Sequence, residues 1–349
     1  MPSTLPNAAE APATAPSGSD RLAWLFRTGQ ADGNAHPLLA PVAELRGDAG
    51  ALAGMPTAPG MPVWVPAEPR HSVDRAWLCR QVAALPPLPR ALTEAARVVA
   101  DAGSTTAACA EVLGRDPALS AQLLRLANAA AHGRAGQVGS LHDAVLLLGR
   151  QKLGALLAAA AVVAQFDQAA CPGFDVQRFW RQSFACALAA QALAADLGAD
   201  EGLAFTTGLL HDLGQLVLAV HMPAAAAQAL AWARLHDLPL HDAERDVLGI
   251  DHAEVGALLA GHWNLPGALV AAIGSHHGPA QPPAPGGRPR LADLLQVADA
   301  MAHALDLDQA AEERVPALCP QLARRLRLTP ERCLRTLAAT QVGVAVIGF

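Results

Sequence analysis

From about residue 76 to the C-terminus, apolar residues recur at helical spacing, and no segment shows the alternating pattern of a β-strand. Residues typical of helix ends bound these segments: Asp116-Pro117 is a typical helix start, whereas Gly149 and Gly198 stand where helices should end. The pattern therefore predicts an all-α fold, a bundle of many helices. We expect helices at about 91–102, 104–114, 116–128, 141–148, 151–166, 175–197, 201–220, 223–236, 240–247, 251–263, 266–275, 290–305, 308–326 and 329–342.

The N-terminal part differs from this pattern. Residues 1–20 are rich in Ala, Pro and Ser, which predicts a disordered tail. In residues 21–75, Gly and Pro interrupt every long element, so we expect an irregular segment of little independent stability, with a short helix at 21–26 and a short strand at 63–65. We expect the main helical domain at 76–285 and further helices packing on it at 286–349.

Composition and charge exclude several classes of protein. Hydrophobic residues make up 52% of the 349 and charged residues 16%, so a large buried core can form. The net charge is −6 and no block of Lys or Arg occurs, which argues against broad nucleic-acid binding. The six cysteines are scattered without a C-x-x-C pair, as is typical of reduced core residues in a reducing compartment.

Features that would direct the chain to a membrane are absent from the sequence. The first 20 residues lack the basic and apolar regions of a secretory signal. The longest uncharged apolar run, 153–164, has roughly half of the ~20 residues that a membrane-spanning helix needs. We therefore expect a cytoplasmic protein with no membrane span.

A histidine and an aspartate stand side by side in the apolar run Gly208–Gly214, as His211-Asp212. Burying the two side chains costs on the order of several kcal/mol unless each is paired with a polar group or a metal ion. The pair therefore predicts either a metal site or a buried polar contact that fixes the register of neighbouring helices.

Several short motifs follow one another in a fixed order between residues 84 and 280. They are Leu85–Pro89, Asp116–Leu119 with Leu123–Asn128, Ser140–Gly149, Trp180–Ser183, Gly208–Gly214, His252–Gly256, Trp263–Pro266 and His276-His277. In this order they resemble the HDOD family, the HD-related output domain of bacterial signalling proteins. The resemblance implies an HD-like helical bundle and a regulatory role that is usually not accompanied by hydrolase activity.

The resemblance extends to HD-superfamily phosphohydrolases, which hold metal ions with an upstream His, a His-Asp pair and a later Asp. His211 and Asp212 match the pair, and Asp299 matches the later Asp. The upstream position is Gln182, and a neutral amide is a poor ligand for transition metals. The comparison implies a degenerate centre with no catalytic residue and no cofactor; a retained metal, Mn or Fe, would be held by His211, Asp212 and Asp299.

Three further histidines would supply additional ligands in a binuclear site. His252 follows Asp251 at a predicted helix start, where capping and exposure explain it. His276 and His277 precede a Gly-Pro turn, which favours a surface position. Separately, the spacing of Asp299 and His303 allows a local pair on one helix, and Asp299 is also a candidate partner of His211.

Three functions are consistent with these residues. The first is a non-catalytic HDOD-type regulatory module that binds a protein partner or a small ligand. The second is a divergent metal-dependent phosphohydrolase, and the third is a cyclic-dinucleotide or nucleotide receptor that uses the same site without turnover. The enzyme would use His211, Asp212, His252, His276, His277 and Asp299.

Overall fold

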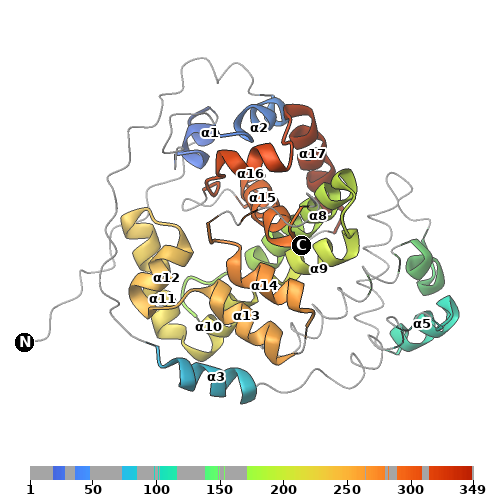
Figure 1. The fold of residues 1–349 in the computed structure, drawn as a ribbon, viewed down its shortest axis with the longest axis horizontal. Helices are drawn as coiled ribbons and strands as arrows, with labels where there is room; N and C mark the ends of the chain where they lie inside the picture. The colour runs from blue at the N-terminus through green and yellow to red at the C-terminus, as the bar shows by residue number, and fades with distance from the viewer. Residues whose placement is uncertain are drawn as a thin grey trace, which may run out of the picture.

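In the computed structural model, every regular element among the described residues is a helix, which confirms the all-α prediction. The structure describes residues 19–27, 36–47, 73–84, 103–115, 138–147, 171–263, 265–279, 289–308 and 314–347, and the single positions 98, 101, 149, 153 and 282. The helices labelled in Figure 1 are α1 (Ser19–Leu25), α2 (Leu39–Arg46), α3 (Arg75–Ala84), α5 (Thr106–Leu113), α8 (Val176–Leu197), α9 (Glu201–Leu210), α10 (Leu213–His221), α11 (Pro223–His236), α12 (Leu240–Leu248), α13 (His252–His262), α14 (Gly267–Ser275), α15 (Leu291–Ala304), α16 (Pro320–Arg325) and α17 (Pro330–Ile347).

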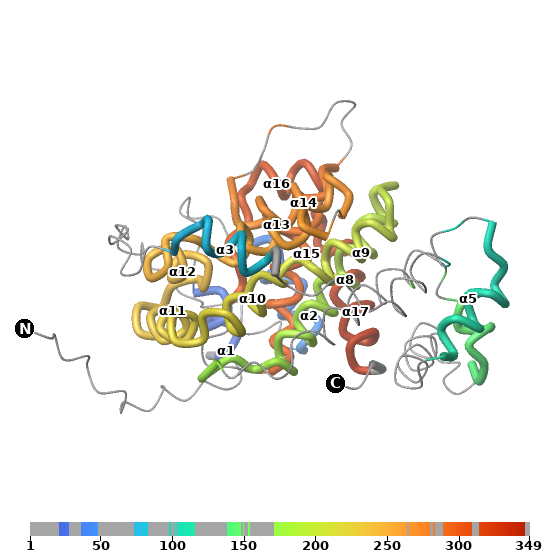
Figure 2. Tube along the Cα trace, turned by 90° about the horizontal axis from the view of Figure 1, so that it is seen from below, coloured from blue at the N-terminus to red at the C-terminus, as the bar shows by residue number. Residues whose placement is uncertain are grey.

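The longest of these helices, α8, lies between two hydrophobic cores. Phe179, Phe184 and Ala187 on α8 belong to a core shared with α9, α10 and α13. Ala185 and Ala189, on the other side of the same helix, belong to a core shared with α15 and α17. Both views show α8 in the middle of the molecule, in contact with α9, α15 and α17 (Figures 1 and 2).

Local sequence signals explain where α8 begins and ends. The Asp175 carboxylate accepts hydrogen bonds from the backbone amides of Gln177 and Arg178, so it caps the first turn. Gly198 ends the helix in the left-handed region, at φ 66°, which glycine adopts without strain. These residues place the predicted helix 175–197 within one residue of its observed bounds.

Two glycines allow the helices around the His-Asp pair to approach closely. A Cβ atom at Gly208 would lie 2.7 Å from the Cα atom of Ala187 on α8. A Cβ atom at Gly214 would lie 1.9 Å from the carbonyl oxygen of His252 on α13. Because neither space admits a methyl group, the turn that carries His211 and Asp212 can pack directly against both α8 and α13.

The prediction of an irregular segment at 21–75 is only partly consistent with the structure, which forms α1 and α2 there. Leu22, Leu25 and Val42 are buried in the core of α15 and α17, and α2 contacts α17. The buried Arg21 guanidinium also pairs with Asp306 beyond α15. Tertiary packing, which the many Gly and Pro residues conceal, therefore stabilises these helices; the predicted strand at 63–65 lies outside the described residues.

Two other predicted helices differ from the observed ones. The predicted helix 201–220 is divided into α9 and α10 at His211-Asp212. Among the described residues of the predicted helix 308–326, which exclude 309–313, Pro320–Arg325 are helical and 314–319 are not. Pro316 and Pro320 lack the amide hydrogen that a helix interior needs, which explains this second difference. The predicted helices 116–128 and 151–166 lie outside the described residues or nearly so.

One helical stretch, Glu201–His221, is long and apolar enough to cross a membrane by composition alone. Most of it, 72% of the relevant window, is buried inside the structure, and it contains the interruption between α9 and α10. Its apolar character is that of a central core helix.

Candidate metal centre in the polar core

Two groups of metal-binding side chains meet at the turn between α9 and α10. His211 ends α9 and is 1% exposed, and Asp212 precedes α10. They are surrounded by the start of α13, the end of α14, and residues of α8, α12 and α15. This turn is therefore the point at which helices distant in sequence present polar groups to one another.

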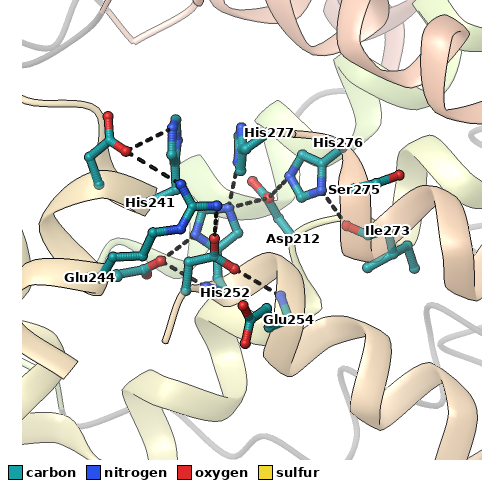
Figure 3. A network of polar contacts seen from close by, with 12 residues as sticks. Asp212, His241, Glu244, His252, Glu254, Ile273, Ser275, His276 and His277 are labelled. Carbon is teal, nitrogen blue, oxygen red and sulfur yellow. Dashed lines mark hydrogen bonds and ion pairs between the residues drawn. The ribbon is translucent and has the colours of Figure 1, made fainter. Parts of the chain in front are cut away.

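The first group, here called the histidine cluster, consists of Asp212, His252, His276 and His277 (Figure 3). One donor atom from each residue lies within 4.8 Å of the others. The Asp212 Oδ1 atom is 3.2 Å from His252 Nε2 and 3.5 Å from His276 Nε2. The His252 and His277 Nε2 atoms are 2.9 Å apart.

Outer partners orient two of these imidazoles. His252 Nδ1 lies 2.6 Å from the Glu244 carboxylate, and His276 Nδ1 donates to the Ile273 carbonyl at 2.6 Å. A histidine whose Nδ1–H is held in this way presents its Nε2 atom as the ligand, which is the usual arrangement in metal sites. Both Nε2 atoms point to Asp212 (Figure 3).

The imidazoles of His277 and His241 are kept neutral. Burial, reinforced by His276 and His241, holds the pKa of His277 well below its ordinary value. The His241 ring stacks on His277 with the ring centres 4.0 Å apart. Burial and the nearby His252 lower the pKa of His241 to about 3. Neutral imidazole is the form that binds a metal ion.

Opposite charges surround the Asp212 carboxylate. Burial would raise its pKa, but His211 and His252 lower it well below the ordinary range. Burial likewise opposes protonation of His252, and the carboxylates of Glu244 and Asp212 raise its pKa well above the ordinary value. Protons on the histidines can therefore balance Asp212 when no cation does.

Buried polar atoms without a hydrogen-bond partner provide a test of whether a cation fits. They include Asp212 Oδ1 and His276 Nε2, and the His276 side chain is 0% exposed. Such atoms cost free energy unless a proton, water or ion satisfies them. Carboxylate oxygen and imidazole nitrogen form a ligand set suited to Mn, Fe or Zn, so the residues of the histidine cluster fit a divalent cation.

The second group, here called the cysteine cluster, consists of Cys186 on α8, His211 and Asp299 on α15. All three are buried, and their donor atoms lie within 4.8 Å of one another. His211 Nδ1 donates to the Gly208 carbonyl at 2.8 Å, and its Nε2 lies 3.5 Å from Asp299 Oδ1. Burial raises the pKa of the Cys186 thiol.

Gln182 contacts His303 on α15. Its amide nitrogen lies 3.1 Å from His303 Nδ1, and His303 Nε2 lies 3.3 Å from Asp299 Oδ1. Because the amide donates to Nδ1, His303 carries its proton on Nε2 and donates it toward Asp299. Gln182 therefore supports Asp299 through His303, and the predicted local pair of Asp299 and His303 is present.

The structure thus brings all the residues named from the sequence to one region. The prediction of exposure for His252 is wrong, as is the preference for a surface position of His276, because the two are 2% and 3% exposed. Asp251 does cap α13, as expected, by accepting from the Glu254 amide. Burial of the two histidines follows from packing of α13 and α14, which local sequence does not reveal.

Sequence reasoning missed Cys186, Glu244 and His241. Cys186 stands four residues after Gln182, so the two share one face of α8, a spacing visible in the sequence. Glu244 reaches His252 across eight residues and a change of helix, which spacing alone does not predict. His241 lies one turn before Glu244 on α12.

Comparisons with known proteins agree with this arrangement. The sequence model described as HDOD domain matches residues 85–279. A crystal structure of a "Putative phosphohydrolase" from Shewanella amazonensis SB2B is 35% identical, with a TM-score of 0.61, over 78% of this chain and 97% of that one. An HDOD domain protein with unknown function from Geobacter sulfurreducens shares the fold, with a TM-score of 0.61 at 22% identity, over 78% of this chain and 97% of that one.

One curated relative also matches at the sequence level. An uncharacterized protein of Treponema pallidum (strain Nichols) is 28% identical over 262 residues, 73% of this chain and 48% of that protein. The chain therefore spans about half the length of this relative.

Proposed function

The chain belongs to the HDOD family, and from this premise we propose that it is a non-catalytic regulatory module that relays a signal by binding a protein partner or a small ligand. The observation that carries the proposal is the position of Gln182, where related phosphohydrolases have their upstream histidine. Its amide nitrogen lies 3.1 Å from His303, and a neutral amide is a poor ligand for transition metals, which supports a centre without hydrolytic activity.

A hydrolytic centre needs a cation with an open coordination position for water and substrate. Around His211, the neighbouring groups include a buried thiol and a buried carboxylate, those of Cys186 and Asp299, and the partly buried Asp212 carboxylate at 3.4 Å. Such a site can specify how α8, α9 and α15 pack, which suits a module that signals through its conformation.

A hydrolysis assay tests the proposal. Purified chain is incubated with Mn²⁺ or Fe²⁺ and a panel of nucleotides and cyclic dinucleotides, beside the variant Asp212→Asn. We expect no turnover that distinguishes the two proteins. Turnover by the native chain that Asp212→Asn abolishes overturns the non-catalytic proposal.

The second candidate function is a metal-dependent phosphohydrolase. The histidine cluster favours it, because Asp212, His252 and His276 offer oriented donor atoms to a cation. When bound, a divalent cation would polarise a phosphoryl oxygen and lower the pKa of a bound water. Metal analysis of the purified chain, with His276→Ala as the comparison, measures occupancy, and the hydrolysis assay above decides whether a bound cation is catalytic.

A receptor for cyclic dinucleotides or nucleotides is distinguished from a protein-binding adaptor by thermal unfolding. A ligand that binds the folded chain raises the midpoint as its concentration increases. A concentration-dependent rise with one nucleotide supports the receptor, and a flat response across the panel supports the protein-binding form of the proposal.

A further inference from the structure

We propose that Cys186, His211 and Asp299, together with Asp212, form a closed, thiolate-containing site for a zinc-class divalent cation. In this site Cys186 supplies the ligand that Gln182 does not. The inference is separate from the proposed function, since it concerns cation binding and not turnover. It rests on three buried residues whose donor atoms lie within 4.8 Å of one another, with the partly buried Asp212 carboxylate 3.4 Å from His211 Nε2.

The carboxylates of Asp212 and Asp299 lie at the Nε2 end of the His211 ring, and the donor atoms of Cys186, His211 and Asp299 lie within 4.8 Å of one another. The Nδ1–H of His211 donates to the Gly208 carbonyl, which leaves Nε2 as the atom that faces the cluster. A cysteine nucleophile activated by histidine needs the opposite arrangement, with the acid at one ring nitrogen and the thiol at the other. Because the Gly208 carbonyl, and not an acid, is the partner of Nδ1, His211 can offer Nε2 to a cation.

The distances are those of ligands rather than of hydrogen-bonded pairs. His211 Nε2 is 3.4 Å from Asp212 Oδ2 and 3.5 Å from Asp299 Oδ1, longer than a good hydrogen bond. In a tetrahedral site with metal–ligand bonds of about 2.1 Å, neighbouring N and O ligands are separated by about 3.4 Å. A single Nε2–H could also donate to only one of the groups that face it.

The donor set identifies the class of cation. A thiolate, an imidazole and carboxylates together select Zn²⁺, or Co²⁺ and Fe²⁺ in its place, over Mg²⁺ or Ca²⁺, which prefer oxygen alone. Coordination deprotonates a thiol outright, so burial of Cys186 does not prevent binding. Four protein ligands would leave no open position, which is typical of a structural zinc site and not of a catalytic one.

The position of Cys186 on α8 explains how it can take the place of the upstream ligand. It lies four residues after Gln182, one helical turn nearer to Gly208 and His211, since Gly208 packs against Ala187. Side chains four apart share a helix face, so the helix that would carry the missing imidazole presents a thiol within 4.8 Å of a ring nitrogen of His211.

Cobalt provides a direct spectroscopic test, because a thiolate bound to Co²⁺ gives a charge-transfer absorption in the near ultraviolet. The full chain is stripped with a chelator and titrated with Co²⁺. We expect the thiolate band in the native chain, and its loss in Cys186→Ser together with weakening of cobalt binding at this site by more than about tenfold, since the loss of an outer-shell partner alone costs about 10–100-fold.

Two variants serve as controls. Cys333→Ser removes a buried cysteine from α17 and should retain the band. His276→Ala removes a ligand atom of the histidine cluster, which contains no sulfur, and should also retain it. If Cys186→Ser does not fold, X-ray absorption at the zinc edge of the zinc-loaded native chain decides, with one sulfur at about 2.3 Å expected. Cobalt or zinc binding without a sulfur ligand, or no binding at all, overturns the inference, whatever the hydrolysis assay gives.

Discussion

The histidine cluster and the cysteine cluster lie on either side of one carboxylate, yet they are built differently. In the histidine cluster, His252 is held by Glu244 and His276 by a backbone carbonyl, and both face Asp212 Oδ1. In the cysteine cluster, the imidazole of His211 faces a thiol and the carboxylate of Asp299. The first has the ligands of a metal hydrolase, and the second has lost one of them.

The difference shows that one carboxylate can serve two clusters of different composition. Asp212 faces both clusters, with Oδ1 toward His252 and Oδ2 toward His211. A substitution at Gln182 therefore affects the cysteine cluster. The buried histidines of the histidine cluster still require a partner for their charge or their lone pairs.

The largest expected effect follows from removing the space between α10 and α13. Gly214→Ala places a Cβ atom 1.9 Å from the His252 carbonyl oxygen, which is backbone and cannot rotate away. We expect a loss of more than about 4 kcal/mol in the free energy of unfolding, measured by urea denaturation. Gly261→Ala on α13 is the matched control, because nothing lies within 4 Å of its Cβ position and helix propensity favours Ala by about 1 kcal/mol. Equal stability of both variants contradicts the packing described.

The next prediction compares Asp212, whose carboxylate faces both clusters, with Asp299, which belongs to the cysteine cluster alone. Asp212→Ala removes the partner of His211, His252 and His276, so we expect a loss of about 2–4 kcal/mol. It should also abolish cation binding by both clusters. Asp299→Ala is predicted to affect only the cysteine cluster. Metal analysis and denaturation of the two variants in parallel measure this, and retention of cations by Asp212→Ala contradicts a shared role for this residue.

A smaller effect tests the outer partner of the histidine cluster. Glu244→Gln replaces the carboxylate that lies 2.6 Å from His252 Nδ1. We expect cation affinity of this cluster to fall by about 10–100-fold, with the thiolate–cobalt absorption of the cysteine cluster unchanged. Glu254→Gln on α13 is the control, since its carboxylate pairs with the exposed Arg75. Unchanged affinity in Glu244→Gln shows that Glu244 does not orient His252.

The smallest expected effect tests the assignment of Gln182. Gln182→Met removes one hydrogen bond to His303 and also a buried amide oxygen that has no partner. The two changes nearly offset each other, so we expect a stability change within about 1 kcal/mol. Cation binding should not change. A large fall in cation affinity, measured by isothermal titration, identifies Gln182 as a ligand and contradicts the description of the cysteine cluster.

Much of the fold is predictable because local residues determine it. Asp175 and Gly198 bound α8, Asp251 starts α13, and helical spacing extends through α11. The break in 201–220 is not predictable from periodicity, because the apolar pattern continues across His211 and Asp212. Within 21–75, the short helix expected at 21–26 is present as α1, whereas α2 is not predicted, because its stability comes from packing against α17 and the core that α15 shares.

The sequence predicts which residues form the site better than it predicts their burial and their neighbours. The family resemblance named His211, Asp212 and Asp299, and the structure brings them together. Burial of His252 and His276 depends on α13 packing against α10 and on α14 packing against α13, α15 and α9. Cys186 has no sequence signature of its own, because a buried cysteine is most often an ordinary apolar residue.

The most direct test of the account measures phosphodiester hydrolysis by the cation-loaded native chain and by Asp212→Asn, side by side. The account predicts that neither protein releases product above the rate of buffer with cation alone. Product released by the native chain and absent with Asp212→Asn would show that the centre is catalytic and would contradict the regulatory function proposed for it.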